Sequence, residues 1–525
     1  MIDTENTTVK RYDSLGTVIT YLNTPDIYKF HFVMNNDYGM LRKVKVGKYV
    51  SVKESSGFVI GQIMNLFKIN EYFLNASTLK ESRTRDVAIQ SIFPVDQWEY
   101  QVAEVDVVGF YPMVDTGMGE GEDKGQEKRG RFQKSTTPVS PGNQVSSVDP
   151  ELLENFLGFN LENGLHLGEM EFEDLSVKID LTRLVQKHFA ILAMSGAGKS
   201  YLTSVILEEL IKRKREDGRI ATIIVDTHGE YSSILDASNI QDKFKDVNLH
   251  VVNGSFIQIG TPFLSLKSFF NYLPKLSHVQ GRELFRIFKD LRNENKNFDL
   301  RDLVKKINDD ESLGKKTKEA LAGWLFMLDQ LGIFSSKEFP FIPDLIKPGN
   351  IVVLDLSGIT SMKHKQIIVD YFASRAFFLR KNGSVPPYTF IIEEAHQFIP
   401  QASASNAIAS NTIETLAREG RKFFASLGLI SQRPVHLNTT ILSQCNSQFI
   451  LKVSNPYDLD HIRSSSEKIT RESLKMISSL PVGYALVVGS AVNVPVFFKV
   501  REREFLVESG TNSLIDVLKS FDEEV

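Results

Sequence analysis

The stretch Ala193–Ser200 constrains this chain more than any other, because it has the spacing of a phosphate-binding loop. It consists of Ala-Met-Ser-Gly-Ala-Gly-Lys-Ser. An apolar run, Phe189–Leu192, precedes it, and apolar residues at helical spacing follow it, so the pattern predicts a strand, a glycine loop and a helix. The first glycine of the usual pattern is replaced by Ala193. A chance glycine-rich turn is the alternative, but the flanking strand and helix favour phosphate binding.

The residue types in this loop suit a nucleotide. Backbone N–H groups of the loop and the N-terminus of the helix together attract an anion. Lys199 is expected to reach the β- and γ-phosphates, and the Ser200 hydroxyl is expected to hold Mg²⁺. Gly196 and Gly198 let the backbone approach the phosphates closely. The residues predicted to bind the cofactor here are Ser195, Gly196, Ala197, Gly198, Lys199, Ser200 and Tyr201.

Composition sets broad bounds. A chain of 525 residues is long enough for two to four domains, and its 42% hydrophobic and 24% charged residues are ordinary for a soluble globular protein. The formal net charge of −4 gives no global basic signature, so any contact with DNA must come from a local basic surface. The single cysteine, Cys445, excludes an internal disulfide and a cysteine-cluster zinc site. With no signal peptide or membrane-spanning run in the sequence, we expect a cytoplasmic protein that does not associate with a membrane.

A second acidic motif follows a later strand. The apolar run Tyr388–Ile392 is followed by Glu393 and Glu394. In phosphate-loop ATPases one such carboxylate holds Mg²⁺ and its neighbour polarises the attacking water, which predicts Glu393 as the metal ligand and Glu394 as the water activator. Glu393 stands where aspartate is usual. A strand that ends in surface acids is the alternative, which the upstream loop makes improbable.

Two more strand ends carry polar side chains. The apolar run Ile220–Asp226 ends in Asp226, and His228 and Glu230 follow closely. Because functional groups gather at the carboxyl ends of strands in open α/β sheets, these three side chains are candidates to face the nucleotide. We predict that Asp226 binds the cofactor, whereas His228 is as well explained as a hydrogen-bonded turn residue.

The strand predicted over residues 424–430 has a glutamine shortly after it and arginines on both sides of it in the sequence. Gln432 follows the strand 424–430 and can sense the γ-phosphate or position water. Arginines on a subunit edge can act in trans, and at least one of the three candidates is expected to be structural. The predicted catalytic residues are Glu394, Glu393, Gln432, Arg421, Arg418 and Arg433, and the predicted metal ligands are Ser200 and Glu393.

The remaining pattern predicts the domain organisation. Short β-rich segments between residues 17 and 111 fit a small barrel or, equally well, a sandwich. The segment around Pro495 is predicted as an edge strand, because proline cannot donate to a ladder. The predicted parts are an N-terminal β-barrel domain over 1–112, a flexible charged loop over 113–142, the ATPase domain over 143–263 and 341–500, a helical insertion over 264–340 and a C-terminal tail over 501–525.

Taken in order, the motifs resemble the HerA branch of the FtsK/HerA family of hexameric DNA-pumping ATPases. The resemblance extends over roughly residues 17–501. It implies an α/β fold with a RecA-like phosphate-loop ATPase domain, a small N-terminal β-barrel and a helical insertion. The residues that carry it are His188–Leu192, Gly196–Ser200, Asp226–Tyr231, Glu393–His396, Leu416–Arg421 and Ser431–Pro434.

The same resemblance implies how such a chain works. It implies ATP and Mg²⁺ as cofactors, a homo-hexamer with ATP sites between neighbours, and duplex DNA in the central channel. Family members work with a partner, often a docked NurA-type nuclease, and bacterial relatives are similar to motor subunits of anti-phage systems that have another effector enzyme.

Two functions fit these expectations. The first is an ATP-driven duplex DNA translocase or helicase that serves DNA end processing or anti-phage defence with an effector. The alternative is a nucleotide-gated ring scaffold that assembles and regulates an effector without processive pumping. Whether DNA changes ATP turnover discriminates between them. The sequence leaves open the effector, the pore-lining residues, the polarity, the ring size and the arginine that acts in trans.

Overall fold

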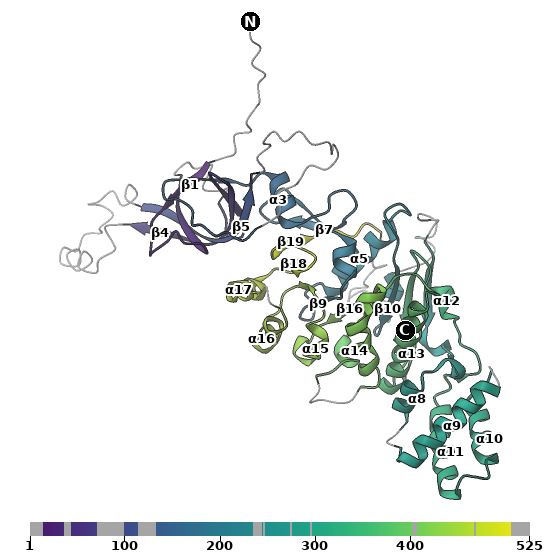
Figure 1. Cartoon of the computed structure of the whole chain (residues 1–525). Helices are drawn as coiled ribbons and strands as arrows, with labels where there is room; N and C mark the ends of the chain where they lie inside the picture. The colour runs from purple at the N-terminus through teal and green to yellow at the C-terminus, as the bar shows by residue number, and fades with distance from the viewer. Residues whose placement is uncertain are drawn as a thin grey trace, which may run out of the picture. The chain divides into compact units, whose positions relative to one another are not determined.

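The computed structural model describes residues 14–35, 44–70, 99–113, 133–234, 244, 247–273, 276–294, 297–401, 407–466 and 469–505 (Figure 1). These residues form two compact units. The first contains the described residues up to Phe159 together with Glu169–Leu175. The second contains Asn160–Gly168 and the described residues from Ser176 onward. The greater part of the predicted loop, residues 114–132, and residues 506–525 of the predicted tail lie outside the described residues.

The first unit is built on a closed six-stranded barrel, which confirms the predicted barrel and excludes the sandwich. Closure by pairing of the first strand with the last leaves the barrel without an open edge. Inward side chains such as Phe30, Val50 and Val105 are completely buried. Helix α3 (Pro150–Leu157) follows the barrel, capped by the Asp149 side chain. In spatial order the strands are β1 (Ser14–Ile19), β2 (Lys29–Met34), β5 (Glu99–Pro112), β4 (Gly57–Asn70), β3 (Tyr49–Glu54) and β6 (Gln144–Ser147).

The second unit contains an eleven-stranded sheet. The seven strands from β11 to β17 in spatial order run parallel, and β18 and β19 continue the sheet antiparallel. Continuous apolar runs suit a parallel sheet that is covered on both faces. In spatial order the strands are β11 (Leu249–Asn253), β14 (Ile351–Asp355), β10 (Ala221–Asp226), β15 (Tyr388–Ile392), β16 (Ala425–Ser431), β9 (Phe189–Leu192), β17 (Ser447–Ile450), β18 (Tyr484–Gly489), β19 (Val496–Val500), β7 (Leu165–Met170) and β8 (Ser176–Ile179).

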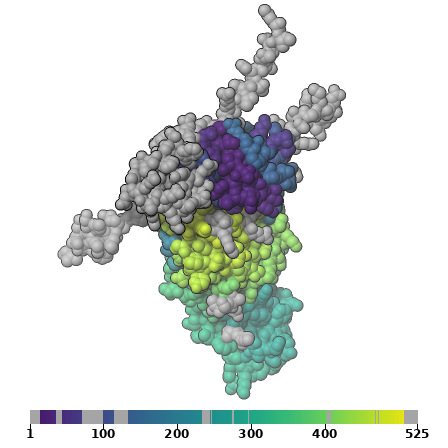
Figure 2. Space-filling model, turned by 90° about the vertical axis from the view of Figure 1, so that its left-hand side faces the viewer, coloured from purple at the N-terminus to yellow at the C-terminus, as the bar shows by residue number. Residues whose placement is uncertain are grey.

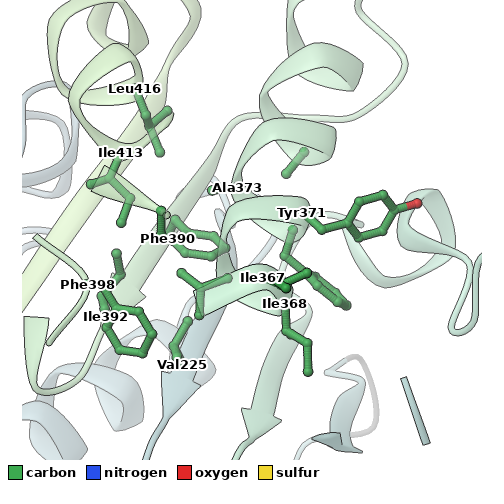
Figure 3. Close-up of a cluster of buried hydrophobic side chains, with 14 of the residues drawn as sticks. Val225, Ile367, Ile368, Tyr371, Ala373, Phe390, Ile392, Phe398, Ile413 and Leu416 are labelled. Atoms are coloured by element: carbon green, nitrogen blue, oxygen red, sulfur yellow. The ribbon is translucent and has the colours of Figure 1, made fainter. Parts of the chain in front are cut away.

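Helices cover this sheet and form its core with it. Helix α13 (Met362–Lys381) buries Ile367, Ile368 and Ala373, which lie near Phe390 of β15 in Figure 3. Helix α14 (Ser410–Glu419) adds Ile413 to the same cluster. Helix α5 (Lys199–Lys212) is buried along nearly its whole length. The shorter helices are α4 (Leu181–Val185), α6 (Glu230–Ile234), α12 (Ile342–Leu345), α15 (Thr439–Leu442), α16 (Pro456–Ser465), α17 (Arg471–Ser479), and the 3-10 turns η4 (Gly254–Phe256), η5 (Thr261–Phe263), η6 (Ala395–Gln397), η7 (Gly420–Phe423) and η8 (Pro434–His436).

A helical region is inserted in the chain between the sheet strands β11 and β14, as predicted. Its base is a short parallel pair, β12 (Ile259–Gly260) and β13 (Phe334–Ser335), which brings the two ends of the region together. In Figures 1 and 2 the helices lie at one end of the second unit, away from β18 and β19. The helices are α8 (Leu266–Tyr272), α9 (His278–Glu294), α10 (Leu300–Asp309) and α11 (Lys315–Asp329).

One strand prediction is wrong. Strand β19 lies inside the sheet between β18 and β7, rather than at an edge. Pro495 precedes the first residue of the strand, Val496, so it removes no ladder hydrogen bond and the argument from proline does not apply.

Among the helices that the structure describes, none is long and apolar enough to cross a membrane.

Candidate active site

The candidate site lies where four neighbouring parallel strands end. Strands β10, β15, β16 and β9 are adjacent in that order and share one direction. The phosphate loop follows β9, the paired glutamates follow β15, and Asp226 and Ser431 end β10 and β16. Because parallel strands present their carboxyl ends at one edge of the sheet, the topology gathers motifs that are far apart in the sequence.

The phosphate loop has a backbone that requires glycine. Gly196 and Gly198 have φ of 75° and 100°, in the left-handed region where a Cβ is strained. Around Gly196 an added Cβ would meet no atom within 4 Å, so the backbone conformation selects glycine there. Among the described residues, no protein acceptor takes the N–H groups of Ser195, Gly196 and Gly198. These donors, at the N-terminus of α5, are available to phosphate oxygens.

The base of the loop is held by β16 and by the segment that follows β17. The Ala193 N–H donates to the Ser431 carbonyl at 3.2 Å, and the Met194 N–H donates to the Lys452 carbonyl at 2.9 Å. Ala193 is completely buried and is not among the residues with positive φ. Alanine therefore fits without strain in place of the usual glycine, and the departure from the motif leaves the loop geometry intact.

Lys199 pairs with both glutamates. Its Nζ lies 3.3 Å from Glu393 Oε1 and 3.2 Å from Glu394 Oε1, and both glutamates are almost completely buried. Burial lowers the pKa of Lys199, but the carboxylates of Glu393, Glu230 and Glu394 outweigh it and raise the pKa overall. The lysine is therefore charged at neutral pH, with its cation beside the phosphate loop.

Glu393 is held by a second set of contacts. Its Oε2 accepts hydrogen bonds from the Thr227 N–H at 3.2 Å and from the Thr227 hydroxyl at 3.3 Å. Burial raises the pKa of Glu393 to about 7, with Lys199 acting against the rise and Glu230 and Asp226 adding to it. A cation that approached this carboxylate would favour its charged form.

Glu394 combines an unusual backbone with an incompletely satisfied carboxylate. Its φ is 48°, in the left-handed region that few non-glycine residues adopt. Its Oε2 lies 3.2 Å from His396 Nδ1, within ion-pair distance, but the direction of approach leaves Oε2 without a hydrogen-bond donor. Burial lowers the pKa of His396, although Glu394 acts against this, so the imidazole is neutral at pH 7. A buried acceptor without a donor is suited to bind water.

The oxygen atoms of the Ser200 hydroxyl and the nearby carboxylates suit Mg²⁺ that is bound together with a nucleotide. The Ser200 hydroxyl donates to the Glu230 carboxylate, next to Lys199 and Glu393. In the described part of the chain, no group of three or more His, Cys, Asp or Glu side chains could hold a metal ion by itself. Mg²⁺ typically binds through one or two carboxylates, substrate phosphates and water, which this set can complete.

Asp226 makes its hydrogen bonds within the turn that follows β10. It is completely buried, and its Oδ1 accepts from the N–H groups of Gly229 and Glu230, while its Oδ2 accepts from those of Tyr231 and Ser232. Both carboxylate oxygens are occupied by four backbone donors, so Asp226 shapes the turn that places Glu230 beside Ser200. The structure thus shows Asp226 supporting this turn, and its role in cofactor binding stays a prediction. His228 is exposed on the same turn.

The structure separates the three candidate arginines. Arg433 is exposed and follows Gln432, which is half-buried, at the edge that carries the phosphate loop. Arg418 pairs with Glu414 on its own helix at 2.5 Å. Arg418 and Arg421 precede the amino end of β16, so the length of the strand separates them from the phosphate loop of the same chain. Arg421 is exposed, and among the described residues no partner contacts its guanidinium.

Tyr201 is held by the segment that follows β19. Its hydroxyl accepts from the Arg503 N–H at 3.0 Å, and the Arg503 guanidinium lies 4.6 Å from the ring centroid. Close by, Arg501 pairs with Glu208 and Glu209 of α5 at 2.8 Å each. The sequence prediction of site residues missed these arginines and Thr227, because their roles depend on contacts between distant segments. His396 belongs to the motif Glu393–His396, and its position two residues after Glu394 was a usable signal.

The chain is similar in sequence to helicases of the HerA type. Residues 165–376 match the family model described as the central domain of helicase HerA. A DNA double-strand break repair helicase HerA from Pyrococcus furiosus is 28% identical over 432 residues, which cover 71% of this chain and 76% of the relative. A probable helicase from Methanocaldococcus jannaschii is 27% identical over 488 residues, which cover 87% of this chain and 86% of the relative.

A solved structure has the same fold. VirB4 of Thermoanaerobacter pseudethanolicus matches with a TM-score of 0.52 and 15% identity, over 66% of this chain and 99% of that chain. The predicted fold class, α/β with a phosphate-loop ATPase domain and a small barrel, is therefore confirmed. The chain is thus similar in its middle part to the central domain of helicase HerA, and similar in sequence to HerA helicases over most of its length.

Proposed function

We propose that this chain is an ATP-driven translocase or helicase that acts on duplex DNA. The observation that carries the proposal is the meeting of Lys199 with Glu393 and Glu394 directly beside a phosphate loop whose N–H groups are available. Relatives named as DNA double-strand break repair helicases support DNA as the partner. A homo-hexameric ring, a docked nuclease or other effector, a role in end processing or anti-phage defence, and a cytoplasmic location are parts of the same proposal.

The arrangement supports a simple division of labour in hydrolysis. Lys199 turns from the glutamates to the β- and γ-phosphates, which the loop N–H groups also bind. The Glu394 carboxylate accepts a proton from water as the water oxygen bonds to the γ-phosphorus. The bond between that phosphorus and the leaving oxygen breaks, and ADP departs with the electron pair. Mg²⁺, bound through Ser200 and Glu393, would offset the phosphate charge.

The experiment that tests the proposal is the ATPase rate of the purified protein with and without linear duplex DNA, over a series of salt concentrations. We expect stimulation by DNA that falls as salt rises, because contacts with the phosphate backbone are mainly electrostatic. Steady turnover that does not respond to DNA would instead favour the nucleotide-gated scaffold. A protein without any ATP turnover in either condition would contradict both.

Two variants assign the chemistry. Glu394→Gln should bind ATP as well as the original protein but hydrolyse it at least about 100-fold more slowly, because an amide cannot take the proton. The matched control is Glu311→Gln, which makes the same change on an exposed side chain. Normal hydrolysis by Glu394→Gln would remove Glu394 from the role of water activator.

A further inference from the structure

A buried line of contacts extends beyond the Lys199–Glu394 pair. On its far side, Glu394 Oε2 lies 3.2 Å from His396 Nδ1, and His396 Nδ1 lies 3.3 Å from the Ser431 hydroxyl. Ser431 ends β16, whereas Glu394 and His396 follow β15. The Ser431 carbonyl also accepts from Ala193 at the base of the phosphate loop. The imidazole thus joins the acidic motif to the neighbouring strand end.

The two oxygens of Glu394 have different surroundings. Oε1 is 3.2 Å from Lys199 Nζ, and Oε2 has only the off-direction approach of His396 among the described residues. If Lys199 turns to nucleotide phosphates, as the proposed function requires, Oε1 loses its cation. Glu394 would then be a buried carboxylate with no donor, which is costly unless another group supplies one.

The His396 imidazole is the group in reach. Its Nδ1 already lies at hydrogen-bond separation from Oε2, so a rotation of the ring that keeps this separation would point the N–H at that oxygen. The Ser431 hydroxyl, which accepts from the Arg433 N–H at 3.1 Å, lies 3.3 Å from the same Nδ1 and helps to fix the imidazole. With Oε2 held by Nδ1–H, the vacated Oε1 is the oxygen that faces the phosphates and can take the proton of water.

We propose that His396 is a positioning residue that takes hold of Glu394 Oε2 when Lys199 moves to the nucleotide. This inference rests on the proposed function, because it assigns a partner to the carboxylate that activates water there. His396 acts through Glu394 and touches neither ATP nor the attacking water.

Three variants at one position test which nitrogen matters. His396→Asn places an amide N–H close to the position of Nδ1, His396→Gln places one close to Nε2, and His396→Ala removes both. We expect kcat to fall about 10- to 100-fold in the alanine and glutamine variants and to be largely kept in the asparagine variant. The KM for ATP and the Kd for a non-hydrolysable ATP analogue should stay within a few-fold of the original values. His436→Asn is the matched control, because its exposed ring lies 6.5 Å from the His396 ring.

A double-variant cycle separates positioning from a general effect on folding. In the Glu394→Gln background, adding His396→Ala should change the residual kcat by less than two- to three-fold, because the carboxylate on which the histidine acts is gone. Unchanged kcat in His396→Ala, or equal losses with asparagine and alanine, would overturn the inference while the original protein still hydrolyses ATP. Loss of analogue binding in His396→Ala would also overturn it. If the original protein does not hydrolyse ATP at all, the proposed function and this inference fall together.

Discussion

Lys199 is the residue on which the charge balance of the site depends. Its ammonium group offsets two carboxylates that are 0% and 1% exposed. We propose that the same group leaves them for the nucleotide, so that the ion pair is exchanged for phosphate contacts during turnover.

Lys199→Ala should abolish nucleotide binding and turnover, because it removes the cation that pairs with both glutamates beside the loop. Titration with a fluorescent ATP analogue, together with the ATPase rate, checks this. Lys214→Ala is the matched control, since the Lys214 side chain is 75% exposed and pairs with Glu216 at the surface. Binding by Lys199→Ala at the original affinity would show that the nucleotide site lies elsewhere.

The raised pKa of Glu393 predicts that the free energy of unfolding depends on pH. Burial raises its pKa to about 7 in the folded protein, above its ordinary value of about 4.5. The folded state therefore binds this proton more tightly than the unfolded state, so the free energy of unfolding should fall as pH rises from about 4.5 to about 7. Urea unfolding over this range without nucleotide or Mg²⁺ measures the slope. Glu393→Gln should flatten it relative to the exposed control Glu311→Gln, and an equal slope in both variants would contradict the assignment.

At this scale the sequence predicted residue types better than residue roles. The loop glycines, Lys199 and the paired glutamates follow from local spacing, because a loop and its helix are local structures. Asp226 looked equally suited to the nucleotide, but its four backbone donors arise from a turn whose path the sequence pattern does not specify. Contacts such as Thr227 with Glu393 join different strands, so no spacing rule indicates them.

Helix α5, which begins with Lys199, is fixed by the segment that follows β19. The Arg501 guanidinium binds Glu208 and Glu209, and its Nε donates to the His166 carbonyl at 2.9 Å. The Glu208 carboxylate also accepts from the N–H groups of Glu504 and Phe505. The helix that presents the phosphate loop is thus tied to β7 and to the end of the sheet.

Arg501→Ala should lower the free energy of unfolding of the second unit by about 3–5 kcal/mol, because it removes the cation that pairs with the buried Glu208 carboxylate and leaves Glu209 with Lys212 alone. Urea unfolding followed by a probe in that unit measures the loss. Arg301→Ala serves as the control, since its side chain is 81% exposed and its pairing with Asp329 should contribute at most about 1 kcal/mol. Similar losses in the two variants would show that Arg501 contributes no more than a surface pair.

The elements themselves were largely predictable, but not all of their neighbours. Apolar runs before acidic or glycine-rich ends indicated β9, β10, β15 and β16, because each strand of a parallel sheet carries its own signal. The interior position of β19 depends on β7, which lies more than 300 residues earlier in the chain, and no local pattern reports such a pairing. Pro495 was misinterpreted for that reason.

At the scale of the whole molecule, the position of Arg421 bears on how many chains make one site. Arg421 precedes the amino end of β16, and the phosphate loop lies at the carboxyl end of the neighbouring β9. An arginine so placed lies away from its own phosphate loop, as a role in trans within a head-to-tail ring would require. The trans role of Arg421 remains a prediction.

Mixing two inactive variants tests this role. Arg421→Ala chains retain Lys199, and Lys199→Ala chains retain Arg421, so random mixing should complete about one interface in four. We expect the mixture to recover ATP turnover that neither variant has alone. The control is a mixture of Lys199→Ala with Glu394→Gln, in which every site lacks one of its own residues. No recovery in an assembly shown to contain both variants would count against a trans role.

The backbone of Glu394 carries a consequence for the evolution of this chain. A left-handed conformation at a non-glycine residue costs about 1–3 kcal/mol, whether or not a nucleotide is bound. Glycine would relieve that cost, so selection for thermal tolerance alone would tend to replace the very side chain that the proposed chemistry needs. If Glu394 persists in lineages that grow at high temperature, its retention would record a demand for ATP turnover that outweighs the demand for stability.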